Sequence, residues 1–353
     1  MIAARPGSSS AGRQSAHRHG RNGAVHLGAI DTLANPMRTA LDAPVRSGPA
    51  RRVLVAGASG FLGRSVVRAL SSAGYGVRGL VRDAARGARV EADGGTPVVG
   101  DILDLRTLKS AATGCSGIVH LAANPPAEED AERVRVDGAA NLVRVARQEG
   151  VARLVIGSGY WVYGSQSELI DEDCPVAPQG ESRVNHAAER EGLEANRTGQ
   201  LEVLVVRPGM VYGNGSWFRG LAEAIRTGEY RVVGGGSNRW SFIDRWDAGR
   251  AFRAVLEEGD PGEVYNAVDG RPAPLREFAD FVAAELGVPP PATVTLETAE
   301  RAVGAIVARH LAADRPTSGA KLRRLSWRPQ IPSYRLGVPE LLREMFPRDG
   351  PVR

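Results

Sequence analysis

Three regularly spaced glycines form the pattern in this chain that most directly indicates a ligand-binding function. Gly57, Gly60 and Gly63 follow a short apolar run at residues 53–56 and precede a helical pattern that begins at Arg64. A strand, a glycine turn and a helix place backbone N–H groups and a helix N-terminus against a pyrophosphate. The glycines permit the tight turn, the approach of the phosphate and close packing of helix on strand. The segment predicts a dinucleotide-binding turn, with an ordinary Gly-rich turn as the alternative.

The end of the second expected strand, at residues 76–81, bears on the choice of cofactor. NAD enzymes usually place Asp or Glu there for the ribose hydroxyls. In this chain that place holds Val81, and Arg82 follows. A guanidinium pairs with a 2′-phosphate through two parallel hydrogen bonds. The sequence therefore favours NADP over NAD, with Arg82 on the phosphate; a solvated loop cation is the other interpretation of Arg82.

The glycine turn lies in a chain of alternating strand and helix patterns. Continuous apolar runs predict strands at residues 52–57, 76–81, 96–100, 117–121, 151–156 and 201–206. Amphipathic segments predict helices between them at about 61–73, 105–112, 129–149 and 182–197. Repeated strand–helix units of this kind predict an α/β fold, a doubly wound parallel sheet of the Rossmann type. Ligands of such sheets bind beyond the carboxyl ends of the strands.

Composition divides the chain into three expected parts. Residues 1–50 are rich in Ser, Gly, Arg, His and Pro, lack periodicity and are expected to be a disordered extension. Residues 51–213 are expected to form the cofactor domain, rejoined by a strand at 263–268. A smaller substrate lobe is expected from residues 214–262 and 269–345.

The charge and the cysteine count exclude several classes of function. Residues 1–52 contain eight Arg and two Asp, a charge of +6, so the remainder of the +5 total is +5 − 6 = −1. A nearly neutral folded part argues against nucleic-acid binding. No apolar run approaches the roughly 18 residues of a membrane span. Two cysteines fit a reducing, cytoplasmic location, and no His/Cys cluster predicts a metal site. The expected partner is a small-molecule substrate.

Several short motifs occur in the order that is typical of one enzyme family. Residues 57–63, Gly-Ala-Ser-Gly-Phe-Leu-Gly, resemble the TGxxGxxG turn of the extended short-chain dehydrogenase/reductases, the NAD(P)-dependent epimerase/dehydratase family. Matches to its GDxxD, HxAA, GTxNLL, VYG, RPxxVYG, FVHVDD and LGWxP motifs follow at residues 100–104, 120–123, 138–142, 162–164, 207–213, 242–247 and 325–329. The resemblance spans residues 51–330 and implies an NAD(P)-dependent oxidoreductase or epimerase/dehydratase-like enzyme.

The resemblance also implies which residues contact the cofactor. The side chain of Asp101 can accept a hydrogen bond from the adenine amino group, and Ala122 and Ala123 are small where the ribose passes. His120 of the same motif is expected to be a packed core residue. The expected cofactor-binding residues lie in the glycine turn and just after the strands: Gly57, Ser59, Gly60, Phe61, Leu62, Gly63, Arg82, Asp101, Ile102, Leu121, Ala122, Ala123, Pro208, Gly209 and Val211.

The catalytic motif of the family is missing from this chain. The family transfers hydride with a Ser or Thr and a Tyr-x-x-x-Lys helix, in which the Lys helps the Tyr to act as a base. The two lysines, Lys109 and Lys321, follow Leu105 and Thr317 at that spacing, so no Tyr-x-x-x-Lys exists.

The helix that should carry the pair is still recognisable. Glu189 matches the acidic residue four places after the Lys, which assigns Asn185 to the Lys place and Glu181 to the Tyr place. Upstream, Gly159 falls at the Ser/Thr place, and Ser158 lies one residue earlier.

Two explanations fit this departure. In the first, the protein is an NADP-dependent reductase or epimerase-like enzyme on a small polar metabolite, with Ser158 and Glu181 as catalytic groups. A partly buried carboxylate can act as a general acid or base. His186, Tyr160 and Tyr163 are weaker candidates, and solvation or packing is the alternative for each. In the second, the protein is a redox-inactive NADP-binding protein: a sensor, a scaffold or a non-redox isomerase or lyase.

The sequence says less about the substrate and the oligomeric state than about the fold and the cofactor. Large side chains of the lobe could contact the substrate or pack in its core: Trp217, Phe218, Trp240 and Arg245. Members of the family often pair through the helices expected here at about 129–149 and 182–197, so a homodimer is expected by analogy.

Overall fold

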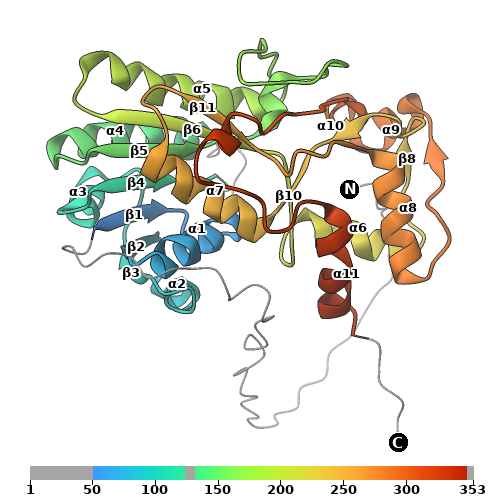
Figure 1. The fold of residues 1–353 in the computed structure, drawn as a ribbon, viewed down its shortest axis with the longest axis horizontal. Helices are drawn as coiled ribbons and strands as arrows, with labels where there is room; N and C mark the ends of the chain where they lie inside the picture. The colour runs from blue at the N-terminus through green and yellow to red at the C-terminus, as the bar shows by residue number, and fades with distance from the viewer. Residues whose placement is uncertain (1–50, 124–131, 348–353) are drawn as a thin grey trace, which may run out of the picture.

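A computed structural model describes residues 51–123 and 132–347 (Figure 1). The expected N-terminal extension, residues 1–50, and the start of the helix expected at 129–149 lie outside the described residues. Figure 1 shows a sheet with helices on both sides and, next to it, a lobe of helices and short strands. The α/β fold class expected from the sequence is confirmed.

The main sheet has seven parallel strands, and its order reverses between β1 and β4. Across the sheet the strands are β11 (Val264–Ala267), β6 (Glu202–Pro208), β5 (Arg153–Gly157), β4 (Gly117–His120), β1 (Arg52–Ala56), β2 (Gly76–Val81) and β3 (Thr96–Val99). The chain therefore winds outward in both directions from β1. In such sheets the ligand crevice opens where the strand order reverses.

Helices cover both faces of the sheet because the strands are apolar on both sides. Val53 and Val55 of β1 belong to one core, while Leu54 and Ala56 belong to the other, as the alternation of side chains along a strand requires. One face carries α1 (Phe61–Ser72), α2 (Gly87–Glu91) and α7 (Arg245–Glu258). The opposite face carries α3 (Leu105–Ala112), α4 (Gly138–Gln148) and α5 (Ser182–Glu194).

The position of α7 differs from the domain boundary expected from the sequence. Residues 214–262 were assigned to the substrate lobe, but Phe252 and Val255 of α7 pack in the core of the main sheet. The helix also lies very close to α1, because a Cβ on Gly249 would be only 2.4 Å from the carbonyl oxygen of Ser65. The chain thus returns from the lobe to the cofactor domain at the start of α7.

The lobe is built around an aromatic core. Phe218, Phe242, Phe278 and Tyr334 are buried together, with the Phe242 and Phe278 rings stacked at 4.4 Å. Its larger helices are α6 (Trp217–Arg226), α8 (Leu275–Leu286) and α11 (Tyr334–Met345). Short strand pairs join its segments: β7 (Met210–Tyr212) with β10 (Phe242–Asp244), β9 (Arg239–Trp240) with β12 (Ala273–Pro274), and β8 (Val232–Val233) with β13 (Thr293–Val294).

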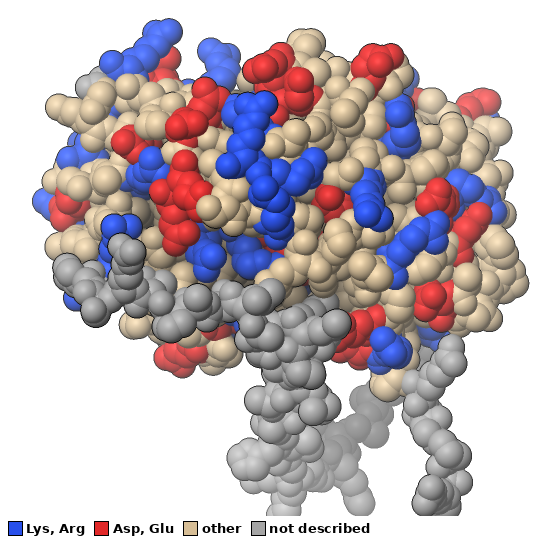
Figure 2. All heavy atoms as spheres, in the orientation of Figure 1, with Lys and Arg blue, Asp and Glu red and all other residues tan. Residues whose placement is uncertain are grey.

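Two small helices complete the lobe. α9 (Leu296–Val303) and α10 (Ala305–Ala312) are separated by Gly304, whose φ of +85° is a conformation that favours glycine. Basic and acidic side chains are interspersed on the face shown in Figure 2, in keeping with the small charge of the folded part. Within residues 51–123 and 132–347, no helix has both the length and the apolar character to cross a bilayer.

Candidate active site

A cavity of about 870 Å³ lies at the point where the strand order reverses. Its walls come from the residues after β1, β2, β4, β5 and β6, and the lobe closes it from the other side with α10 and the start of α6. The cavity therefore lies where the fold predicts a ligand site, between the cofactor domain and the lobe.

Every residue expected to bind the cofactor lines this cavity, and so do Ser158 and Glu181. The fold thus brings together segments that are up to 154 residues apart in the chain, from Gly57 to Val211. Sequence reasoning did not identify four further lining residues that bear on function: Arg86, Arg135, Trp161 and His310. For the expected cofactor-binding residues, and for Ser158 and Glu181, contact with a cofactor or substrate stays a prediction.

The glycine turn fits a dinucleotide because larger side chains have no room there. Gly57 has a φ of +85°, and a Cβ on it would lie 2.6 Å from the carbonyl carbon of Leu121. A Cβ on Gly63 would lie 2.0 Å from the carbonyl oxygen of Gly57. Gly60 is the N-cap of α1 and supplies no side-chain cap, so the first N–H groups of the helix are left for a ligand. These residues would hold the pyrophosphate at the positive end of α1.

The end of β2 presents cations to the cavity and no carboxylate. Val81 is buried, whereas Arg82 and Arg86 are exposed cavity residues. The nearest carboxylate, Asp83, accepts a hydrogen bond from the Ala85 N–H at 2.9 Å and caps the short helix at Ala84–Arg86. Arg82 and Arg86, and not Asp83, are therefore the charged residues that this loop presents to the cavity.

The part of the cavity after β3 is held by local hydrogen bonds. Asp101 accepts a hydrogen bond from the Leu103 N–H at 2.9 Å through Oδ1. Ile102 is buried, and its carbonyl oxygen accepts a hydrogen bond from Asn141 Nδ2 at 3.1 Å. A Cβ on Gly138 would lie 2.9 Å from Ile102 Cδ1, so α4 packs closely beneath this loop. The loop is therefore fixed in place independently of a ligand.

The positions of the missing catalytic groups adjoin one another in the cavity. A Cβ on Gly159, at the Ser/Thr place, would lie 3.8 Å from Asn185 Nδ2, at the Lys place. Glu181, at the Tyr place, lines the cavity but is exposed, which corrects the expectation of a partly buried carboxylate. The physical reason is that Glu181 is the N-cap of α5, so the helix begins only after it.

A buried ion pair lies below these positions. The carboxylate of Glu189 accepts hydrogen bonds from Arg207 Nε at 2.9 Å and Nη2 at 2.7 Å, and both side chains are at most 6% exposed. Burial alone would raise the pKa of Glu189, but the hydrogen bonds from Arg207 and His186 bring it below its ordinary value. His186 Nδ1 lies 3.4 Å from Glu189 Oε2, and His186 does not line the cavity. A direct catalytic role for His186 is therefore not supported.

The two tyrosines near the catalytic positions are buried. Tyr163 donates a hydrogen bond to Asn266 Oδ1 at 2.9 Å, and burial raises its pKa to about 12. Tyr160 is fully buried, and neither residue lines the cavity. Both side chains pack in the core and are not placed to act on a ligand. Ser158 does line the cavity, with its hydroxyl oxygen buried.

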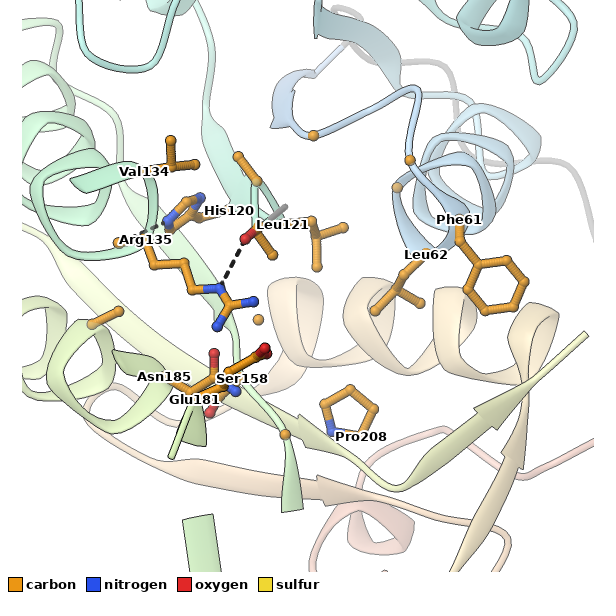
Figure 3. A pocket seen from close by; sticks show the side chains of 18 of the residues that line it. Phe61, Leu62, His120, Leu121, Val134, Arg135, Ser158, Glu181, Asn185 and Pro208 are labelled. Carbon is orange, nitrogen blue, oxygen red and sulfur yellow. Dashed lines mark hydrogen bonds between the residues drawn. The ribbon is translucent and has the colours of Figure 1, made fainter. Parts of the chain in front are cut away.

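Arg135 brings a positive charge to the same part of the cavity. It lies in a π-helical turn, Arg133–Asp137, of the kind that often occurs at functional sites. Its Nε donates to the Ala123 carbonyl oxygen at 3.0 Å, and Figure 3 shows its guanidinium extending toward Ser158 and Glu181. Burial lowers the pKa of Arg135, and the charge of Glu181 opposes that change. No sequence motif marks this residue.

His120 is a buried core residue, as expected. Its Nε2 lies 3.1 Å from the carbonyl oxygen of Arg135, which can only accept, so the ring carries its proton on Nε2. Burial lowers the pKa of His120 to about 4, and the ring is therefore neutral near pH 7. Its visible role is to hold the π-helical turn in place.

The lobe wall of the cavity is largely apolar and aromatic. It consists of Trp161, Met210, Trp217, Ile306, Val307, His310 and Leu311. Of the four lobe residues expected near the substrate, only Trp217 lines the cavity. Phe218 and Trp240 are buried in the lobe core, and Arg245 stacks on Trp246 at 4.1 Å instead. The aromatic core of the lobe includes Phe218 and Trp240 because both side chains are largely apolar.

The fold, the glycine turn and the cavity together define an enzyme that uses a nicotinamide dinucleotide. Residues 53–267 match the model of the NAD dependent epimerase/dehydratase family. The chain belongs to this family: it is an extended short-chain dehydrogenase/reductase of the reductase and epimerase type, and an NAD(P)-dependent oxidoreductase.

Two relatives and one solved structure illustrate the similarity. A 3-diazoavenalumate denitrifying reductase from a Streptomyces species is 34% identical over 307 residues, which cover 81% of this chain and 99% of the relative. A 4-hydroxy-2-methyl-3-oxo-4-farnesyl-3,4-dihydroquinoline-1-oxide ketoreductase from Stigmatella aurantiaca is 33% identical, with 67% and 74% covered. The dTDP-glucose 4,6-dehydratase of Streptomyces venezuelae, solved as a double mutant with NAD bound, gives a TM-score of 0.71 at 25% identity, covering 84% and 97%.

Proposed function

We propose that this protein is an NADPH-dependent reductase of aromatic, electron-poor substrates that acts without a tyrosine–lysine pair. The observation that carries the proposal is the single cavity that joins the glycine turn to an aromatic wall. Between them, the catalytic places hold Gly159, Glu181 and Asn185. When bound, the nicotinamide supplies a hydride. The residues of this chain bind and orient the two reactants.

The preference for NADPH is supported by the charges at the end of β2. Arg82 and Arg86 both reach the cavity, and Asp83 is engaged in capping a helix. Two guanidinium groups next to a ribose favour a 2′-phosphate over free hydroxyls.

The substrate class is supported by the lobe wall. Trp161 and Trp217 offer flat apolar surfaces, and Met210 and Ile306 extend them. Such a wall binds a planar ring more favourably than the small polar metabolite expected from the sequence. The Stigmatella ketoreductase compared above is named for a dihydroquinoline, a ring-containing molecule.

The altered catalytic places are consistent with a substrate that needs no proton from the enzyme. The Streptomyces relative is named as a denitrifying reductase of a diazo compound. For an aryl diazonium ion, a hydride alone completes the reduction: a C–H bond replaces the C–N bond, and N₂ leaves as a neutral molecule. Phenolate and amine side chains couple readily to diazonium ions. A site with Glu181 and Asn185 in place of Tyr and Lys, and with Tyr160 and Tyr163 buried, avoids that side reaction.

The test is a substrate panel with NADPH deuterated at the transferring carbon. The panel contains aryl diazonium ions, aromatic ketones, aromatic aldehydes and aromatic enones, and deuterium in the product is measured by mass spectrometry. We expect enzyme-dependent deuterium transfer to at least one aromatic class. The controls for direct reaction of diazonium ions with NADPH are a mixture without protein and Gly57→Ala at an NADPH concentration too low to load this weaker-binding variant. Tight NADPH binding without transfer to any member would refute the proposal and favour the redox-inactive NADP-binding alternative.

A further inference from the structure

His310 of α10 faces the cavity next to the altered catalytic positions. Its ring stacks on Trp161, with centroids 3.7 Å apart and planes 24° from parallel. Trp161 in turn adjoins the Ser/Thr place, because a Cβ on Gly159 would lie 3.3 Å from Trp161 Cδ1. The imidazole is therefore one ring away from the place where the family carries its catalytic hydroxyl.

The proton of His310 is placed by its neighbour Arg315. Arg315 Nη2 lies 3.5 Å from His310 Nδ1, and Nη1 donates to the His310 carbonyl oxygen at 3.1 Å. A guanidinium has donors only, so Nδ1 must accept and the ring proton must lie on Nε2. No described residue forms a hydrogen bond with Nε2, and this N–H is left for a ligand in the cavity.

Burial of the charged side chain of Arg315 is energetically unfavourable and needs compensating contacts. Arg315 is 3% exposed and forms no ion pair with any described carboxylate. An isolated buried charge is strongly unfavourable. The charge of the neighbouring Asp314 favours the cation, and the guanidinium itself contacts His310 and the face of Trp161, 4.6 Å from the guanidinium carbon. The guanidinium therefore lies directly against the two rings that form the cavity wall.

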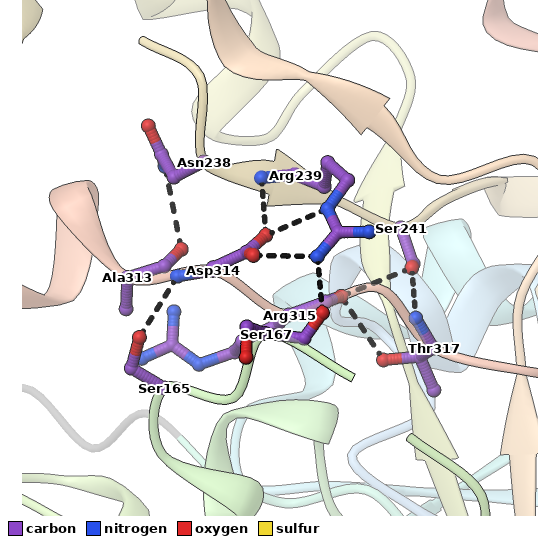
Figure 4. A network of polar contacts seen from close by, with 9 residues as sticks. All are labelled: Ser165, Ser167, Asn238, Arg239, Ser241, Ala313, Asp314, Arg315 and Thr317. Atoms are coloured by element: carbon purple, nitrogen blue, oxygen red, sulfur yellow. Dashed lines mark hydrogen bonds and ion pairs between the residues drawn. The ribbon is translucent and has the colours of Figure 1, made fainter. Parts of the chain in front are cut away.

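The segment that carries Arg315 is firmly anchored (Figure 4). Asp314 forms an ion pair with Arg239 at 2.7 Å, and its N–H donates to Ser165 Oγ at 3.0 Å. The carbonyl oxygen of Arg315 accepts a hydrogen bond from Ser241 Oγ at 3.1 Å. These contacts tie the end of α10 to β9 and to the loop after β5, so the guanidinium is held in a defined place against His310.

We propose that His310 is a substrate-binding residue whose neutral imidazole donates a hydrogen bond from Nε2 to an acceptor carried by the aromatic ring of the substrate. Arg315 is the positioning residue that holds the imidazole in this tautomer. The aromatic class of the ligand rests on the proposed function. His310 donates a hydrogen bond only and transfers no proton. Burial and, after it, the charge of Arg315 lower the pKa of His310 to about 3, so the ring stays neutral in the cell.

A matched pair of ligands tests the hydrogen bond. Acetophenone carries a ring and a carbonyl acceptor, and α-methylstyrene has the same shape with a methylene group in place of the oxygen. Binding of each to the protein with NADP⁺ bound is measured by calorimetry, where no turnover occurs. We expect the wild type to prefer acetophenone about fivefold, the value of one net hydrogen bond. Equal binding of the two, or binding of neither, would overturn the proposal.

Two variants of His310 distinguish the hydrogen bond donated by Nε2 from the stacking of the ring on Trp161. His310→Phe keeps a ring against Trp161 and loses the donor, so the preference for acetophenone should disappear. His310→Gln keeps an N–H near Nε2 and loses the ring, so both ligands should bind more weakly while the preference remains. The opposite pattern, with the preference kept by His310→Phe and lost by His310→Gln, would show a purely stacking role.

The tautomer is measured directly in protein labelled with ¹⁵N-histidine. We expect His310 Nδ1 to resonate as an unprotonated nitrogen, and Arg315→Met to shift protons onto it. A protonated Nδ1 in the wild type would overturn the assignment. These readouts also separate the two proposals: a kept ligand preference without NADPH consumption refutes the reductase, whereas deuterium transfer with no ligand preference refutes the role of His310.

Discussion

Replacement of Glu189 by Gln isolates one partner of the buried pair with Arg207. The change keeps the shape of the side chain and removes its charge, so the guanidinium of Arg207 stays buried without a counter-ion. The substitution weakens the two hydrogen bonds that Arg207 donates to the Glu189 carboxylate, at 2.9 Å and 2.7 Å. Arg207 also lies over the ring of Tyr163, 4.8 Å from its centroid, which holds it in place and limits its escape to solvent.

The cost follows from burial. Removal of one partner of a buried ion pair destabilises a protein by about 3–5 kcal/mol, and Gln retains one acceptor, which places Glu189→Gln near 3 kcal/mol. That is a large share of a stability that is typically about 5–15 kcal/mol. The matched control is Glu202→Gln. Its partner Arg153 is 23% exposed and Glu202 is 45% exposed, so solvent screens the pair and the loss should stay below about 1 kcal/mol.

Equilibrium unfolding in urea measures both variants. The midpoint should fall sharply for Glu189→Gln with an unchanged slope, since a change in slope would report a different denatured state. The stability that Glu189 contributes should decrease at acidic pH. Because the folded pKa of Glu189 lies below its ordinary value of 4.5, its stabilisation is present above that pH and is lost as the pH falls through the folded pKa. The stability of Glu189→Gln should therefore fall less steeply with decreasing pH than that of the wild type.

Two results would refute this reasoning. The first is a destabilisation by Glu189→Gln that is no larger than that of Glu202→Gln. The second is an unchanged acid profile, which would mean that the carboxylate does not titrate differently in the folded and unfolded chains.

Three further predictions concern the cavity. Arg82→Asp should reduce the preference for NADPH over NADH by about tenfold or more in fluorescence titrations, since a charge-assisted hydrogen bond is worth about 1.5–3 kcal/mol; an unchanged ratio would exclude Arg82 as the phosphate ligand. Gly57→Ala should weaken NADPH binding at least about tenfold through backbone strain and a clash with Leu121. Gly150→Ala, with φ +66° and no atom within 4 Å of the new Cβ, should leave binding unchanged. For the ketones and aldehydes of the panel, whose reduction needs a proton, Glu181→Gln should lower turnover about a hundredfold, unlike Glu191→Gln elsewhere on the same helix, and an undiminished rate would exclude Glu181 from catalysis.

The sheet and the cofactor turn could be predicted because their signals are local. A continuous apolar strand such as residues 53–56 can be buried only between two layers, and the Gly57 φ and the Gly63 contact demand residues without a Cβ. The places assigned to the altered catalytic groups, at fixed offsets from Glu189 and from the segment at 162–164, line the same cavity, and their catalytic role stays a prediction.

The remaining site residues depend on contacts between distant segments, which no local pattern reveals. His310 reaches the cavity because α10 ends in a segment pinned to β9, and Trp161 receives it there. Arg135 is placed by a π-helical turn without a sequence signature. Similarly, the expected partial burial of Glu181 was wrong, because Glu181 is the N-cap of α5 and lies outside the helix, where it is exposed. Pairing of two copies through α4 and α5 stays a prediction.

The return of the chain from the lobe to the main sheet has a consequence for synthesis on the ribosome. The first 213 residues contain β1 to β6, yet the core under α7 and the edge beside β6 are completed only by residues 245–267. A nascent chain that has released only the expected cofactor domain therefore exposes the apolar side chains of β5 and β6 that α7 later covers. Such a chain is prone to aggregation until this helix emerges. A fragment that stops at Gly213 would keep that surface exposed permanently.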